Sequence, residues 1–315
     1  MTHGFQALPL PIVQLSLAAV LKCGQSFRWS IFPLFPCLTT PGSTADPTHE
    51  YRLCLRDRVV CLRQSPSTLF YRSVYPDPQP NPTQLALRDA ETLVWLRDYF
   101  QLEVDLVALY DEWGMRDVVF RGVRERFMGI RMLRQDPWEN LVSCVSYDVL
   151  CYSNAHRESS LRFICSSNNN ISRITKMVQS LCKKYSPPLL LLPDPFASSI
   201  SGEPEERTYH PFPAPSVLAA PDVGSTLRSL GFGYRAEFIQ RTAAMLVDTH
   251  GPSSSDSMGE ASETWLKNLR EVSTDEAREE LLKFVGVGRK VADCVLLMSL
   301  DKVSSLVHAC HSFKS

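Results

Sequence analysis

The sequence lacks an excess of charge of either sign and lacks any long hydrophobic run. Its 315 residues include 33 Lys and Arg against 34 Asp and Glu, a net charge of −1. Such a chain does not hold nucleic acid by bulk attraction, so any such contact needs a local basic patch. A transmembrane helix needs about 20 apolar residues, and runs such as residues 15–21 fall far short. With no basic segment ahead of the first apolar stretch, we expect a soluble intracellular chain with no membrane partner.

Cysteine pairs with the spacing of a metal site are also absent. The ten cysteines are scattered along the chain, and none forms a Cys-x-x-Cys pair. Scattered cysteines in apolar surroundings are typical of reduced core residues in a chain of this length. The seven histidines are dispersed as well. We therefore expect neither a disulfide framework nor a metal site, and no cofactor.

The residue pattern changes from β-rich to helical along the chain. Residues 52–60 alternate around a polar turn at 56–58, which is typical of a strand hairpin. Thr83 is predicted to cap a helix, and Asp136-Pro137 has the N-cap acid and first-turn proline of a second helix start. A proline-rich stretch at 187–221 is expected to be a surface loop. The fold class is therefore predicted as α+β: an N-terminal antiparallel-sheet domain over residues 1–130, followed by an all-α domain over residues 131–315.

The segment most informative about chemistry is residues 284–294, FVGVGRKVADC. It is expected to join two helices through a glycine hairpin. Gly286 and Gly288 would let the backbone approach a ligand closely, and the free N–H groups that open the second helix suit a phosphate. Lys290 falls in the first turn of that helix, where the helix dipole disfavours the ammonium form and so helps the amine act as a nucleophile. Cys294 lies four residues on and therefore on the same face.

Taken alone, this segment leaves other interpretations open. The hairpin can be a plain tight connection, with Lys290 a solvated cation. It also matches part of a dinucleotide fingerprint, which would suit a nucleotide-dependent oxidoreductase. However, the preceding segment is helical, no βαβ unit surrounds it, and there is no P-loop Gly-Lys-Ser/Thr. By itself Cys294 is equally well a buried helix cysteine.

Three further blocks accompany the hairpin: GQSFRW at 24–29, SSNNNI at 166–171 and GFGYR at 231–235. In this order and rough spacing, the four blocks resemble the 8-oxoguanine DNA glycosylase family of the helix-hairpin-helix superfamily. The resemblance extends from about residue 11 to residue 302. It implies a sheet-bearing glycosylase domain followed by an all-α helix-hairpin-helix domain. It also implies base-excision repair, in which 8-oxoguanine opposite cytosine is removed from duplex DNA and the abasic site is nicked by β-elimination.

The resemblance also implies roles for individual residues. Lys290 would attack the sugar C1′ and form a Schiff base. The carbonyl of Gly24 would accept the hydrogen that 8-oxoguanine carries at N7, and Cys294 would contact the flipped base. Other residues match the family's DNA contacts. Asn168 would help fill the position that the flipped base leaves, Arg173 and Arg235 would read the orphaned cytosine, and Tyr234 would insert into the duplex as a wedge. Gly286 and Gly288 of the hairpin would contact the DNA backbone. The implied partner is double-stranded DNA with 8-oxoguanine paired with cytosine, bound by a monomer in the nucleus and also the mitochondrion.

Two stretches depart from the family pattern. Residues 144–162 intervene where a continuous buried helix is expected, and residues 303–315 replace a region in which the family carries an aspartate. That carboxylate would stabilise positive charge developing on the sugar. At or near its start each stretch has Val-Ser, as Val145-Ser146 and Val303-Ser304, a dipeptide that an intron start encodes in frame. We therefore expect both stretches to be translated intron; the alternative is that the chain is a divergent isoform. In either case the helical domain is interrupted at 144–162 and truncated after 302. Catalysis would then be impaired, and a non-catalytic lesion-binding module is the alternative function.

Overall fold

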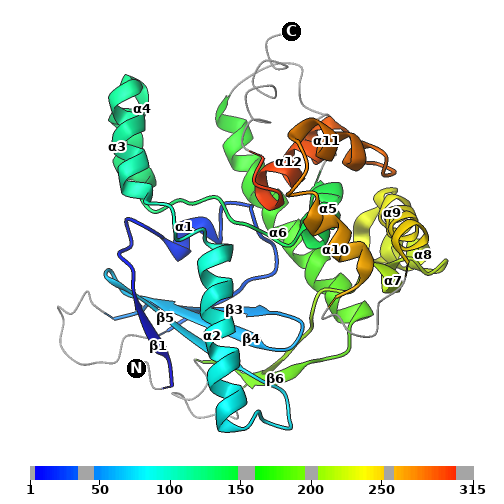
Figure 1. Ribbon diagram of the computed structural model, residues 1–315, viewed down its shortest axis with the longest axis horizontal. Helices are drawn as coiled ribbons and strands as arrows, with labels where there is room; N and C mark the ends of the chain where they lie inside the picture. Colours follow the sequence, from blue (N-terminus) through cyan, green and yellow to red (C-terminus); the bar gives the residue numbers. More distant parts are fainter. Residues whose placement is uncertain (1–3, 35–45, 148–159, 196–204, 252–258, 303–315) are drawn as a thin grey trace. The chain divides into compact units, whose positions relative to one another are not determined.

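The computed structural model describes residues 4–34, 46–147, 160–195, 205–251 and 259–302, with backbone only for 147 and 160–170 (Figure 1). The chain forms two compact units. The first comprises residues 1–133 and 187–211, and the second comprises residues 134–186 and 212–315. The predicted α+β class is confirmed, because an antiparallel sheet is followed by a series of helices. The predicted domains, residues 1–130 and 131–315, differ from these units in their boundary and in the place of residues 187–211.

A five-stranded antiparallel sheet forms the centre of the first unit. Its strands are β1 (Gln6–Pro9), β2 (Ser30–Pro33), β3 (His49–Cys54), β4 (Val59–Gln64) and β5 (Thr68–Val74), in the order β1-β5-β4-β3-β2. β3 and β4 form the hairpin that the alternation at 52–60 predicts, with Leu53 opposite Val60. The turn closes through Leu55 N–H, which donates to the Arg58 carbonyl at 2.8 Å.

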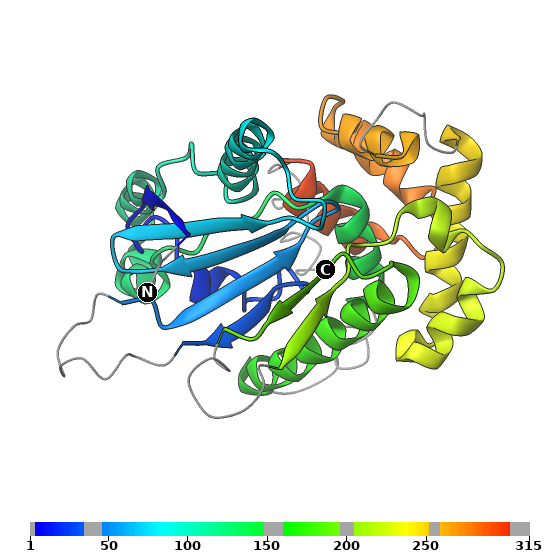
Figure 2. The same ribbon diagram turned by 90° about the horizontal axis from the view of Figure 1, so that it is seen from below.

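Both faces of this sheet are covered, which explains why β3 and β4 are buried along most of their length. Successive side chains in a strand point to opposite faces. Leu53 and Val60 join a large core with α1 (Leu17–Val20) and α2 (Pro82–Tyr99). Cys54 and Cys61 belong to a smaller core on the other side. Figure 2 shows the strands from below.

The smaller core is completed by a second hairpin, β6 (Leu190–Pro193) with β7 (Glu206–Tyr209). The prediction of a surface loop over residues 187–221 is therefore wrong. Tyr209 packs with Cys54 and Cys61, and the Arg52 guanidinium donates to the Pro193 carbonyl at 2.9 Å. The hairpin forms because it buries apolar surface and gives a partner to a buried arginine, although its prolines obscure the strand pattern.

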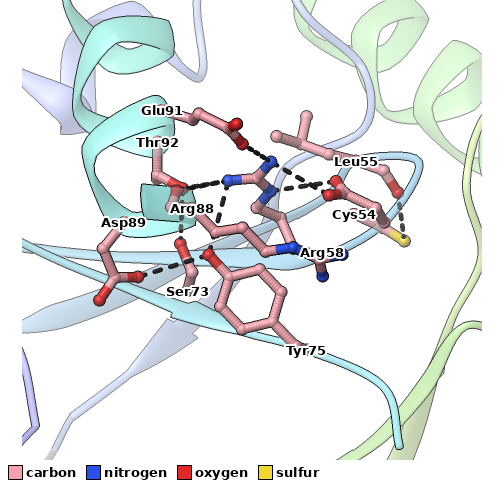
Figure 3. A network of polar contacts seen from close by, with 10 residues as sticks. Cys54, Leu55, Arg58, Ser73, Tyr75, Arg88, Asp89, Glu91 and Thr92 are labelled. Atoms are coloured by element: carbon pink, nitrogen blue, oxygen red, sulfur yellow. Dashed lines mark hydrogen bonds and ion pairs between the residues drawn. The ribbon is translucent and has the colours of Figure 1, made fainter. Parts of the chain in front are cut away.

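A buried arginine joins the β3–β4 turn to α2 (Figure 3). Arg58 is 5% exposed, and its Nη1 donates to the Arg88 carbonyl at 2.6 Å and to Thr92 Oγ1 at 2.7 Å. Its Nη2 pairs with Glu91 at 3.0 Å. α2 begins at Pro82 behind the N-cap Asn81, which forms a capping box with Gln84. The prediction that Thr83 is the cap is therefore wrong, since Thr83 lies inside the helix.

The first unit also contains a pair of helices, α3 (Leu106–Arg116) and α4 (Val118–Val123), and the short η1 (Arg124–Phe127). Asp105 is the N-cap of α3 and Asp117 is the N-cap of α4, and each side chain accepts hydrogen bonds from two backbone N–H groups. Side-chain carboxylates satisfy the free donors at a helix start.

The second unit is helical. Its elements are α5 (Pro137–Tyr147), α6 (Ser160–Tyr185), α7 (Pro215–Leu218), α8 (Val223–Leu227), η3 (Arg228–Phe232), α9 (Arg235–His250), α10 (Ala261–Asn268), α11 (Thr274–Leu282) and α12 (Arg289–Ser299). The predicted start of α5 is confirmed, since Asp136 Oδ1 accepts from the N–H groups of Trp138 and Glu139 at 3.0 and 3.1 Å. Residues 148–159 of the predicted interruption at 144–162 and the whole stretch 303–315 lie outside the described residues. Among the helices that the structure describes, none has the length and apolar character to cross a membrane.

Candidate functional site

The predicted helix-hairpin-helix is present in the second unit, with α11 and α12 joined by residues 283–288. Val287 N–H donates to the Phe284 carbonyl at 3.2 Å, which closes the turn. Gly288 is the N-cap of α12, and its carbonyl accepts from Ala292 at 3.0 Å. The first N–H groups of α12 are therefore not used by a side-chain cap, as a phosphate-binding helix start requires.

Gly286 is the position in this hairpin that only glycine fits. Its φ of +78° lies in the left-handed region, which L side chains rarely adopt. A Cβ at this position would also lie 2.3 Å from Cδ2 of Phe238 on α9. The hairpin backbone thus packs directly on an aromatic ring.

Helix α9 holds the hairpin at a second point. The Thr242 hydroxyl, 2% exposed, donates to the Val285 carbonyl at 3.1 Å. Phe284 is buried and meets Trp265 of α10 edge to face, with ring centroids 6.1 Å apart. These contacts hold the hairpin at Phe284, Val285 and Gly286, and neither Phe238 nor Thr242 was identified from the sequence.

Lys290 lies in the first turn of α12, directly after the hairpin. The residue is half-buried, and its Nζ is shielded from solvent. Cys294 follows one turn later, is also half-buried, and is a thiol rather than half of a disulfide. A spacing of four residues places both on one face of the helix. The structure therefore brings Lys290, Cys294, Gly286 and Gly288 together within one motif.

Tyr234 and Arg235 stand at the start of α9, behind two glycines with positive φ, Gly231 at +93° and Gly233 at +60°. This irregular backbone separates η3 from α9 and sets Tyr234 at the surface, where it is 53% exposed. The Arg235 guanidinium lies 5.0 Å from the centroid of the Tyr234 ring, a cation–π distance. An exposed aromatic ring beside an arginine suits contact with nucleic acid bases.

Asn168 and Arg173 both lie on α6, whose later part contacts the core of the second unit. Arg173 is exposed. The side chain of Asn168 lies outside the described residues. α6 also contacts η3, the segment just before Tyr234.

Gly24 belongs to the first unit and has a φ of +88°. The rest of its GQSFRW block is mostly structural. The Gln25 side chain donates to the Arg131 carbonyl and accepts from Leu133 N–H, each at 2.9 Å. Trp29 is buried, and its Nε1 donates to the Tyr99 hydroxyl at 3.0 Å. The block thus forms a rigid support for the left-handed turn at Gly24.

Arginines pair with two carboxylates in this region, one on α12 and one just after its end. Asp293 Oδ1 lies 3.0 Å from Nε of Arg278 on α11. Asp301 Oδ2 lies 2.8 Å from Nε of Arg134. Both carboxylates therefore have structural partners in this unit.

Comparison with known proteins agrees with this arrangement. Residues 7–141 match the family described as 8-oxoguanine DNA glycosylase, N-terminal domain. Over 302 residues the chain is 33% identical to N-glycosylase/DNA lyase of Saccharomyces cerevisiae. The matched region covers 95% of this chain and 67% of that relative. The chain belongs to the 8-oxoguanine DNA glycosylase family.

Other members of the 8-oxoguanine DNA glycosylase family extend this result. N-glycosylase/DNA lyase OGG1 of Arabidopsis thaliana is 30% identical over 304 residues, 95% of this chain and 64% of the relative. The chain thus spans about two thirds of the length of these two curated relatives. Their name describes bifunctional enzymes, which combine base excision with cleavage of the DNA strand.

Solved structures of 8-oxoguanine glycosylases show the same fold. MBOgg1 in complex with a low-affinity DNA ligand has a TM-score of 0.60 and 25% identity, covering 94% of this chain and 77% of its own. The Clostridium acetobutylicum 8-oxoguanine glycosylase/lyase in its apo form has a TM-score of 0.60 at 23% identity, with 93% and 76% covered. The predicted family and fold class are therefore confirmed, whereas the roles of the individual site residues stay predictions.

Proposed function

We propose that this chain acts in base-excision repair as a bifunctional glycosylase and lyase on duplex DNA that contains 8-oxoguanine opposite cytosine. The observation that carries the proposal is the place of Lys290, a lysine with a shielded Nζ in the first turn of α12, directly behind the Gly286–Gly288 hairpin. An exposed surface lysine would have neither the shielded Nζ nor the position in the first turn of a helix. Family membership supplies the reaction class, and the hairpin supplies donors for the DNA backbone.

In the proposed reaction, the neutral Nζ of Lys290 attacks C1′ of the damaged nucleotide. The bond from C1′ to the base nitrogen breaks, and the oxidised base leaves with the bonding electrons and takes up a proton. One proton then moves from the amine nitrogen to O4′ as the C1′–O4′ bond breaks and the sugar ring opens, which leaves a protonated Schiff base between Nζ and C1′. Loss of a proton from C2′ then expels the 3′ phosphate by β-elimination, and water releases the lysine.

Recognition of the lesion is assigned to the residues matched by the family pattern. Gly24 would accept the N7 hydrogen that distinguishes 8-oxoguanine from guanine, and its φ of +88° is compatible with a backbone carbonyl presented without a side chain. Cys294 would contact the flipped base. Tyr234, Arg235, Arg173 and Asn168 would contact the duplex around the vacated position.

Borohydride trapping tests this proposal. The chain is incubated with an 8-oxoguanine·cytosine duplex and sodium borohydride. A covalent complex is expected for the parent chain in low yield, because residues 303–315 contain no aspartate or glutamate to stabilise charge on the sugar, and none is expected for Lys290→Gln. Lys283→Gln is the matched control. Lys283 is an exposed lysine at the other end of the connection between α11 and α12, and it pairs with Glu280. Equal trapping by Lys290→Gln would refute the proposal. Lesion-selective binding without trapping by the parent chain would instead indicate a non-catalytic lesion-binding module.

A nucleotide-dependent oxidoreductase is not supported. The glycine hairpin lies between two helices, α11 and α12, whereas the dinucleotide fingerprint follows a strand. For an enzyme acting on DNA we further propose a nuclear location, with a monomer as the active species. Imaging of a fluorescent fusion and sedimentation of the purified chain test these two points.

A further inference from the structure

One row of side chains on α9 runs from the start of the helix to the hairpin. Tyr234, Phe238 and Thr242 are spaced four residues apart and therefore lie along one face of α9. Tyr234 is 53% exposed, Phe238 is half-buried and Thr242 is 2% exposed. Exposure thus falls steadily along the row toward the point where Thr242 bonds to Val285.

Phe238 contacts the hairpin at its tightest point. A Cβ on Gly286 would lie 2.3 Å from Cδ2, 2.5 Å from Cγ and 2.8 Å from Cβ of Phe238. The Cβ of Phe238 is fixed by the backbone of α9, so rotation of the ring alone cannot open this space. The distance between α9 and the hairpin is therefore set jointly by the ring of Phe238 and the missing side chain of Gly286.

The same ring supports Tyr234. The centroids of the two rings are 5.6 Å apart with an interplanar angle of 76°, an edge-to-face arrangement that aromatic pairs favour. Phe238 thus contacts both the hairpin at Gly286 and the exposed ring of Tyr234. Phe238 therefore links the hairpin to Tyr234 and does more than fill the core beside α9.

We infer that Phe238 is a positioning residue that fixes the distance between the DNA-contacting hairpin and the Tyr234 ring. This inference rests on the proposed function and adds a residue to the same site. A duplex held by its backbone at the hairpin has a defined register, so an aromatic wedge enters the right base step only if its separation from the hairpin is constant. Phe238 provides this separation without touching DNA or the reacting atoms.

The first measurement needs no DNA. Hydrogen–deuterium exchange of the peptide covering residues 284–290 is compared in the parent chain, Phe238→Ala, Phe238→Tyr and Ile239→Val. Ile239 is the adjacent residue of α9, is 1% exposed, and is the control for lost packing away from the hairpin. Phe238→Ala is expected to speed exchange in this peptide about tenfold, while Phe238→Tyr keeps the ring and restores the parent rate. An unchanged rate in Phe238→Ala overturns the inference.

The second measurement links the position of the hairpin to DNA. Phe238→Ala is expected to weaken affinity for an 8-oxoguanine·cytosine duplex about tenfold and to lower the fluorescence of a 2-aminopurine placed beside the lesion at saturating protein. Ile239→Val is expected to change neither by more than about twofold. A merely structural role would lower stability in both variants but leave the fluorescence at saturation unchanged.

A double variant gives the sharpest test. Gly286→Ala places a methyl group against the ring, so it is expected to weaken duplex affinity more than tenfold. Phe238→Ala in the same chain removes the ring, and the double variant is expected to be no worse than Gly286→Ala alone. Losses that multiply would show that the two residues act separately and would overturn the inference. Failure of the parent chain to bind the lesion duplex refutes the proposed function itself, and the parent chain alone reveals that outcome.

Discussion

Arg278 on α11 and Asp293 on α12 form an ion pair across the helix-hairpin-helix, with Nε and Oδ1 3.0 Å apart. Their side chains are only 14% and 20% exposed, so solvent screens this pair less than the other pairs of these helices. Arg278 also pairs with Asp275 at 2.7 Å within α11. The two helices are thus joined by charge as well as by the hairpin that connects them.

Asp293→Ala is therefore expected to lower the free energy of unfolding by about 1–2 kcal/mol, because Arg278 loses a charged hydrogen bond. Urea denaturation followed by circular dichroism measures the change. Glu280→Ala is the matched control, since it breaks the Glu280–Lys283 pair on α11, whose side chains are 32% and 62% exposed. The control should cost less than about 0.5 kcal/mol. An equal loss in both variants would contradict a special role for the Arg278–Asp293 pair.

Arg58 provides a second prediction, for the first unit. Arg58→Ala removes hydrogen bonds to Arg88, Thr92 and Glu91 from a buried position, and we expect a loss of about 3 kcal/mol in the free energy of unfolding. Arg58→Lys should recover little, because an ammonium group cannot reproduce the planar fork of donors. Arg97→Ala is the control, because Arg97 lies on α2 with Arg88, Glu91 and Thr92 but has an exposed partner in Glu103. This variant should cost under about 0.5 kcal/mol. Calorimetric melting of the three variants checks the order.

The sequence predicts the parts of this fold that depend on neighbouring residues. The N-cap at Asp136 and the hairpin glycines follow from local rules, because their side chains or backbone act within four residues. The β3–β4 hairpin follows from its alternation. Family resemblance adds the candidate site residues, which no local rule could bring together.

Contacts between distant segments could not be predicted in this way. Thr242 and Val285 are 43 residues apart, and nothing in the sequence near either one indicates the other. Arg58 lies in a polar turn, and only the fold shows that α2 covers it. The β6–β7 hairpin is stabilised by its packing on β3 and β4 rather than by its own residue pattern.

A third prediction concerns alkaline pH. Burial raises the pKa of Tyr51 from 10.0 to about 12. Because the folded pKa lies above the unfolded value, this group contributes stability that is fully present below pH 10 and is lost as the pH rises through 12. A shift of this size corresponds to roughly 2–3 kcal/mol. Tyr51→Phe cannot ionise, so its melting temperature should fall less than that of the parent chain between pH 10 and 12. Equal slopes in this window would show that Tyr51 does not ionise on unfolding.

The fourth prediction separates binding from folding at Tyr234. Because this ring is 53% exposed, Tyr234→Ala should change the free energy of unfolding by less than about 1 kcal/mol, the loss of its edge contact with Phe238. Affinity for an 8-oxoguanine·cytosine duplex should fall about tenfold or more, because stacking of an aromatic ring on a base is worth about 1–3 kcal/mol. Tyr234→Phe keeps the ring and should retain most of the affinity. The slope of log affinity against log salt should be unchanged in both variants, since neither removes a phosphate-neutralising charge. Urea denaturation measures the free energy of unfolding, and fluorescence anisotropy at several salt concentrations measures the affinity and its salt slope. A changed slope would place Tyr234 at the DNA backbone instead of the bases.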